Sequence, residues 1–131
     1  MSRRPPPRTV GPVGVADFVR YAGASGDFNP LHYDDAIARA AGFRTVFAQG
    51  MFSAGVLGAY VADSFGAASV RRFNVRFVDV VWPGDALTCA AIITREYDEA
   101  GERHVDVELT CTRQTGELAV RGTATLVVTG T

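Results

Sequence analysis

The feature that most constrains this chain is a stretch without charged side chains, residues 45–62. Its continuous apolar part, residues 51–62, is about a dozen residues long, which suits a buried core helix and is too short to cross a bilayer. Its apolar residues fall on every face of a helical wheel, which predicts burial on all sides. We therefore expect one enclosed central helix over residues 50–64, ended by Phe65 and Gly66.

The segments on either side of this helix differ in their periodicity. Before it, apolar residues at helical spacing predict an amphipathic helix over residues 15–24, and Asp34 or Asp35 can cap a short helix that reaches residue 41. After it, apolar and polar residues alternate, which predicts strands near residues 72–77, 86–96, 104–111 and 118–128. Pro83 and Gly84 suit the two central positions of a type II turn.

These elements constrain the architecture. Strands about 4.8 Å apart make a sheet more than about 20 Å wide, whereas one helix is only about 10 Å across. A single helix therefore covers the sheet only if the sheet curls around it, and exposed strand edges remain. We expect an α+β fold in which an antiparallel sheet of about five strands wraps around one long buried helix. A second copy would complete the packing, which predicts a homodimer or higher oligomer.

Length, charge and cysteine content argue against several classes of protein. The chain has 131 residues, enough for about one domain, and its 13 basic and 14 acidic side chains leave a net charge of -1. This balance argues against a nucleic-acid-binding protein. Cys89 and Cys111 lie in strand-like segments without metal-binding spacing, so we expect two reduced cysteines in the sheet and no metal site.

The N-terminal segment is basic and rich in proline, but no apolar segment follows it, so we expect no signal peptide. We expect residues 1–9 to form a flexible tail and residues 10–131 to form a single domain. The protein is accordingly expected to be cytoplasmic, with no membrane contact.

The loop over residues 21–35 holds the first candidate site. It places Asp27 and His32 five residues apart, with Gly26 and Pro30 favouring a non-helical course. An Asp and a His on one rigid loop can converge on a single water or proton, and histidine titrates near neutral pH. Two other interpretations stay open. Asp27 can instead form a turn with the backbone of residue 29 or 30, and His32 can be a surface histidine.

The start of the central helix, Gln49-Gly50-Met51, is the second candidate. The first N–H groups of a helix have no partner within the helix and lie at the positive end of its dipole. A glycine there lets a ligand oxygen approach the backbone, as an oxyanion must. The alternative is that Gly50 only permits a tight turn into the helix.

The segment from Tyr21 to Asp34 resembles the hydratase motif of MaoC-like, (R)-specific enoyl-CoA hydratases, which have the hotdog fold. Its matching positions here are Tyr21, Ala22, Ser25, Gly26, Asp27, Asn29, Pro30, His32 and Asp34. The likeness continues over nearly the whole chain after Val10, in length and in the order of elements. It holds equally for single-hotdog bacterial hydratases and for actinobacterial β-hydroxyacyl-carrier-protein dehydratase subunits.

The resemblance implies a role for each matched residue. Asp27 and His32 would form a catalytic dyad that holds a water, Asn29 would support the loop, and the Gly50 N–H would bond the thioester carbonyl oxygen. The reaction would add water to a trans-2-enoyl thioester and give the (R)-3-hydroxyacyl thioester. Coenzyme A or a carrier-protein phosphopantetheine would carry the acyl group, and neither a metal nor a redox cofactor would be needed. In hotdog dimers the acyl chain enters between the subunits.

The chain departs from the family pattern at two positions. The family commonly has His-Gly where this chain has Gln49-Gly50, so the glycine N–H is kept and the neighbouring side chain differs. Some relatives have a serine on the central helix where this chain has Gly58. That glycine either widens the acyl pocket or allows close packing of helix and sheet.

The remaining expected contacts are with the substrate. We expect Asn29, Gln49, Met51 and Gly58 to line the substrate site. Arg72, with neighbouring arginines, is expected to meet the phosphates of the carrier, although a solvated strand face explains these charges equally well.

Two alternatives to a hydratase remain. A hotdog acyl-CoA thioesterase commonly has a catalytic carboxylate on the central helix, and here the acid on that helix is Asp63, at its far end. A pocket-forming subunit of a heteromeric dehydratase tends to lack the Asp/His pair, which this chain has in Asp27 and His32. The dyad therefore favours the hydratase.

Overall fold

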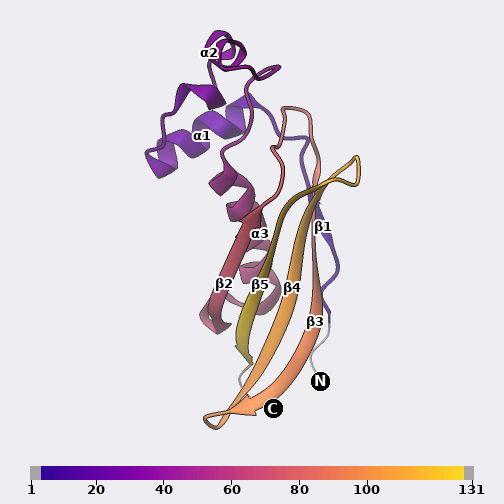
Figure 1. Cartoon of the computed structure of the whole chain (residues 1–131). Coiled ribbons are helices and arrows are strands. Elements are labelled where there is room, and N and C mark those ends of the chain that lie inside the picture. The colour runs from indigo at the N-terminus through magenta and orange to yellow at the C-terminus, as the bar shows by residue number, and fades with distance from the viewer. Residues whose placement is uncertain (1–3, 129–131) are drawn as a thin grey trace.

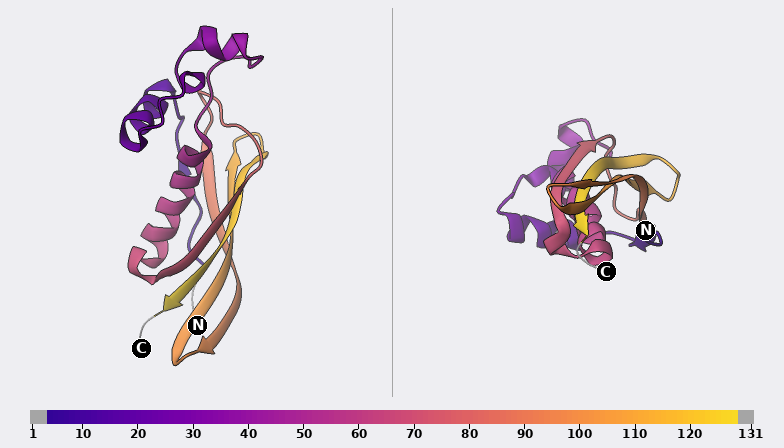
Figure 2. Two further views of the ribbon diagram at one scale, coloured as in Figure 1. Left: turned by 60° about the vertical axis from the view of Figure 1, so that its left-hand side comes forward. Right: turned by 90° about the horizontal axis from the view of Figure 1, so that it is seen from below.

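The computed structural model describes residues 4–128. Five strands form one antiparallel sheet in the order β1-β3-β4-β5-β2 (Figure 1). They are β1 (Arg8–Val10), β2 (Val70–Phe77), β3 (Leu87–Glu99), β4 (Glu102–Arg113) and β5 (Leu118–Val128). The sheet curls around helix α3 (Gly50–Phe65), which confirms the expected hotdog architecture (Figure 2).

The core lies between α3 and the concave face of the sheet. From α3, Leu57, Tyr60 and Val61 are each at most 1% exposed, and alternate residues of β4, such as Val105 and Val107, face them. A fully buried side chain of this size contributes roughly 1.5–3 kcal/mol by leaving water. Cys89 and Cys111 are free thiols at opposed positions of β3 and β4 within this core, as expected.

The expectation that α3 is enclosed on every side is wrong for the single chain. Met51 is 57% exposed, and Gly55 and Ala59 on the same face of α3 are exposed as well. The sheet covers one side of the helix and α1 covers part of another, and within residues 4–128 this face stays exposed. Its apolar residues produced the all-round pattern in the sequence.

A helical layer lies at the end of the molecule where α3 begins (Figure 1). It consists of α1 (Val15–Ser25), the short 3-10 helix η1 (Pro30–His32) and α2 (Asp35–Ala40), while η2 (Ala67–Ser69) connects α3 to β2. Asp34 caps α2 by accepting a hydrogen bond from the Ile37 N–H. Phe18 of α1 packs edge-on against Phe52 of α3, with ring centroids 5.6 Å apart.

The N-terminal boundary differs from the expectation. Arg8 and Thr9, assigned to a flexible tail, belong to β1 and pair with Cys89 and Thr88 of β3. Residues 1–3 of that tail lie outside the described part of the chain. The assignment of residues 10–131 to one domain stays a prediction.

Two turns agree with their sequences. Gly84 has a φ of 94°, as the third residue of a type II turn requires, and the Asp85 N–H closes the turn on the Trp82 carbonyl at 3.0 Å. Ala100 and Gly101, both at positive φ, form the two-residue hairpin between β3 and β4. Over residues 4–128, no helix has the length and apolar character needed to cross a membrane.

Candidate active site

The loop between α1 and η1 is held by hydrogen bonds from side chains to backbone. The Ser25 hydroxyl accepts from the Asp27 N–H at 3.1 Å, and Asp27 Oδ1 accepts from the Asn29 N–H at 3.3 Å. Asn29 Oδ1 in turn accepts from the Leu31 N–H and caps η1, which carries His32. Asp27 therefore does form the turn considered above, while its exposed carboxylate remains open to solvent.

His32 lies on the inner side of this loop and is 8% exposed, so it is not a surface histidine. Its Nδ1 is 2.8 Å from the Phe47 carbonyl oxygen, and its ring lies edge-on to the Phe47 ring at 5.0 Å. A carbonyl oxygen can only accept, so Nδ1 carries the proton in this pair. Nε2 of the neutral ring is then the acceptor, with its direction fixed by the fold.

The N-terminus of α3 lies close along the chain to Phe47, the residue that His32 contacts. Gly50 is the first residue of α3 and comes three residues after Phe47. Both residues line a cavity of about 300 Å³, together with Ser53 one turn further along α3 and Phe77 at the end of β2. The first N–H groups of α3 thus lie beside a cavity at the positive end of the helix dipole.

Gln49 is in the protein interior. It is 1% exposed, and its Nε2 donates to the Phe18 carbonyl of α1 at 2.9 Å. Its Oε1 is buried without a hydrogen-bond partner among the residues described. Gln49 is absent from the residues that line the cavity, and in this structure it connects α1 to the start of α3.

The other expected substrate contacts are spread along α3 and β2. Met51 is on the exposed face of α3. A methyl group added at Gly58 would meet the Phe73 ring at 3.7 Å, which agrees with close packing of helix and sheet. Arg72 lies on β2 five residues before Phe77, roughly 16 Å away along the strand, so within one chain it is remote from the cavity.

No group of three or more His, Cys, Asp or Glu side chains suited to a metal ion occurs within residues 4–128. The polar groups that line the cavity are instead the Ser53 hydroxyl, the Asp79 carboxylate and backbone N–H groups at the start of α3, whereas Asp27 and His32 are not among its lining residues. The lining groups can hold a water, and the backbone N–H groups can receive a developing negative charge on oxygen.

A family model described as MaoC like domain matches residues 2–115 of the chain. The chain belongs to this family. The (R)-specific enoyl-CoA hydratase of Rhodospirillum rubrum is 31% identical to it over 119 residues, which cover 88% of this chain and 80% of that protein.

Two further comparisons give the extent of the likeness. The peroxisomal hydratase-dehydrogenase-epimerase of Neurospora crassa is 35% identical over 100 residues, which are 76% of this chain. The chain spans only 10% of the length of that larger protein. The structure of the (R)-hydratase from A. caviae, described as involved in PHA biosynthesis, superposes with a TM-score of 0.84 at 24% identity, covering 98% of both chains.

In this MaoC-like chain the cavity includes residues that the sequence did not single out. Ser53 could have been found, because it is a polar residue one turn after Gly50 in the otherwise apolar first half of α3. Phe77 and Asp79 reach the cavity from the end of β2 and the loop after it. Only the tertiary structure brings those two next to Gly50.

Proposed function

We propose that the protein catalyses the reversible addition of water to a trans-2-enoyl thioester, giving the (R)-3-hydroxyacyl thioester. The observation that carries this proposal is the hydrogen bond from His32 Nδ1 to the Phe47 carbonyl, three residues before Gly50. One short segment thereby joins His32, through its Nδ1, to the N-terminus of a helix. Membership of the MaoC-like family and the identity to an (R)-specific enoyl-CoA hydratase support the same chemistry.

In the proposed reaction, Asp27 and His32 together hold a water. One O–H bond of the water breaks, its proton passes to the dyad, and the oxygen bonds to C3 of the enoyl group. The π electrons move toward the thioester oxygen, and a hydrogen bond from the Gly50 N–H stabilises the negative charge that develops there. A proton from the dyad then bonds to C2 and the thioester carbonyl re-forms. No redox step occurs, and the thioester itself supplies the acidity at C2.

The N-terminus of α3 is suited to that charge. A helix of this length carries about half a positive charge at its N-terminus. A negative oxygen that develops there during the reaction is stabilised more than the neutral carbonyl of the substrate. This difference between transition state and ground state is what accelerates a reaction.

We further propose that the acyl group is carried by coenzyme A or a carrier-protein phosphopantetheine, and that the working form is a homodimer or larger assembly. The exposed apolar face of α3 and the edge strand β2, where Phe77 is 51% exposed, support a second subunit there. Because Arg72 is remote from the cavity within one chain, its contact with the carrier phosphates would require a second subunit. A cytoplasmic location stays a prediction.

The test is a hydration assay with purified protein and trans-2-enoyl-CoA substrates of several chain lengths, which follows loss of the conjugated thioester absorbance. Asp27→Asn and His32→Gln should each lower kcat by about 10²–10⁴-fold, because each removes a proton-transfer group. The control is Asp98→Asn, an exposed acid in the β3–β4 hairpin. Wild-type kcat in either dyad variant would refute the mechanism.

Two other outcomes would select the alternatives. Release of free thiol without hydration would indicate an acyl-CoA thioesterase. Hydration only after co-expression with a second MaoC-like chain would indicate a pocket-forming subunit of a heteromeric dehydratase.

A further inference from the structure

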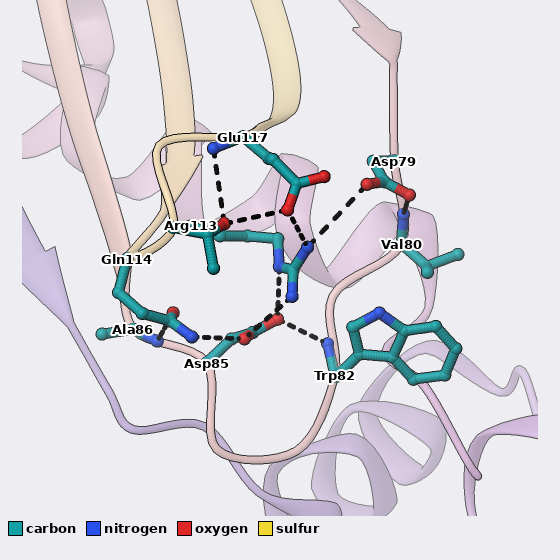
Figure 3. A network of polar contacts seen from close by, with 9 residues as sticks. Asp79, Val80, Trp82, Asp85, Ala86, Arg113, Gln114 and Glu117 are labelled. Carbon is teal, nitrogen blue, oxygen red and sulfur yellow. Dashed lines mark hydrogen bonds and ion pairs between the residues drawn. The ribbon is translucent and has the colours of Figure 1, made fainter. Parts of the chain in front are cut away.

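A buried ion pair joins the loop after β2 to the end of β4 (Figure 3). The side chains of Asp85 and Arg113 are 5% and 9% exposed. Arg113 Nε donates to Asp85 Oδ2 at 2.7 Å, and Gln114 Nε2 donates to Asp85 Oδ1 at 2.8 Å. The Trp82 N–H donates to Asp85 Oδ2 at 2.8 Å. Both carboxylate oxygens are therefore satisfied.

The same network reaches further along the loop and into the turn before β5. Arg113 lies 3.8 Å from the Asp79 carboxylate, which accepts from the Val80 N–H at 2.8 Å. Gln114 Oε1 accepts from the Ala86 N–H at 2.8 Å. Segment 79–86 is thus held at both ends by the end of β4. Burying an ion pair carries a desolvation cost that can cancel its Coulombic gain, so stabilisation of the loop alone is a weak explanation for it.

The loop supports the segment that holds the candidate histidine. The Val81 carbonyl accepts from the Ala48 N–H at 2.8 Å. The preceding carbonyl, that of Phe47, accepts from His32 Nδ1. The Phe47 ring lies between the His32 ring at 5.0 Å and the Trp82 ring at 6.1 Å. Contacts therefore run without interruption from the ion pair to the histidine.

We propose that the Asp85–Arg113 pair positions His32, by fixing the loop that in turn fixes the Phe47 carbonyl. The role of His32 in hydration rests on the function proposed above. The dependence of the His32 tautomer on the Asp85–Arg113 pair is independent of that function. Asp85 and Arg113 do not reach the cavity, and they act through Trp82 and Phe47. A displacement of about 1 Å at a reacting group can cost on the order of 10²-fold in rate.

The test compares Asp85→Asn and Arg113→Lys with the wild type by long-range proton–nitrogen NMR of the histidine rings. The chain has 2 histidines, so His32→Gln assigns the His32 signals. The wild type should show the Nδ1–H tautomer of His32. Each variant should show a mixture of tautomers and a kcat lowered by about 10–100-fold, with a smaller change in KM. Arg113→Lys keeps a cation beside Asp85, so this variant still tests the proposal if Asp85→Asn fails to fold.

The matched control is Val105→Ala, a fully buried residue on β4 roughly 26 Å along the strand from Arg113. It should lower stability while leaving the His32 tautomer and kcat as in the wild type. Folded Asp85 or Arg113 variants with a single tautomer and wild-type kcat would overturn the proposal. A tautomer that depends on Asp85 in a protein without hydratase activity would support the positioning role and refute the proposed function instead.

Discussion

Two glycines of α3 lie under aromatic rings of β2, and they differ in how much space the rings leave. A methyl group at Gly50 would lie 3.3 Å from the Phe77 ring, whereas one at Gly58 would lie 3.7 Å from the Phe73 ring. The second distance is an ordinary van der Waals contact, and the first is tighter. A methyl group at Gly50 would thus require the Phe77 ring to shift by a few tenths of an ångström, while one at Gly58 fits without such a shift.

Gly58→Ala should therefore stabilise the protein. Alanine in a helix interior is favoured over glycine by about 0.5–1 kcal/mol, since it loses less backbone freedom on folding. Urea unfolding should show this gain, and Gly23→Ala in α1, where the added methyl group has no neighbour within 4 Å, is the matched control. A loss of stability in Gly58→Ala alone would mean that the Phe73 ring cannot adjust. A shift toward shorter acyl chains would mean that Gly58 lines the pocket.

Individual residues also mark the limit of what the sequence predicts. The burial of His32 and its bond to Phe47 connect positions 15 residues apart, and no local pattern encodes that contact. Gln49 was expected at the substrate, but its amide turns inward to the Phe18 carbonyl. The non-helical course of the loop with Asp27 and His32 was predictable because its turn-forming residues are local, whereas the partners of these side chains depend on packing.

Among the elements, α3 and the long strands were predictable because each repeats one pattern over many residues. Strand β1 was missed because three residues after a run of prolines carry little periodicity, and its pairing with β3 is non-local. The loop over residues 78–86 likewise has a clear turn sequence but gives no sign that Asp85 will meet Arg113. That pairing spans 28 residues and determines where the loop lies.

The loop should carry a pH-dependent part of the stability. Burial alone would raise the pKa of Asp85, but hydrogen bonds from Arg113, the Trp82 N–H and Gln114 outweigh it and hold the pKa below its usual value. A lowered carboxyl pKa stabilises the fold above the pKa of an unfolded aspartate, about 3.9. That contribution is lost as the pH falls through the pKa of the folded state.

Asp85→Asn should accordingly lower the free energy of unfolding by about 3–5 kcal/mol at neutral pH, because it leaves Arg113 buried without its partner. The difference from the wild type should shrink as the pH falls below the pKa of an unfolded aspartate, about 3.9, and on through the lower pKa of folded Asp85. Urea unfolding across this pH range measures it. Asp63→Asn, which removes an exposed ion pair with Arg8, should cost at most about 1 kcal/mol, and a difference for Asp85→Asn that does not change with pH would contradict this account.

At the scale of the whole molecule, one chain leaves its central helix only partly covered. The exposed face of α3 and the exposed rings at the β2 edge lie on neighbouring elements, and a methyl group added at Gly58 would meet the Phe73 ring between them. An apolar surface of this kind, next to an unpaired strand edge, is stable in water when another surface covers it. Phe77, one of these exposed rings, also lines the cavity beside Gly50.

We therefore expect the protein to sediment as a dimer or larger, with at least twice the chain mass of 14.0 kDa. Met51→Lys places a charge on the α3 face and should shift sedimentation toward the monomer as the protein is diluted. Ile92→Lys changes a residue of similar exposure, 50% against 57%, on β3 and should leave the assembly intact. If both variants sediment like the wild type, the exposed face of α3 is not the interface. If Met51→Lys lowers kcat only in parallel with dissociation, the second subunit completes the active site.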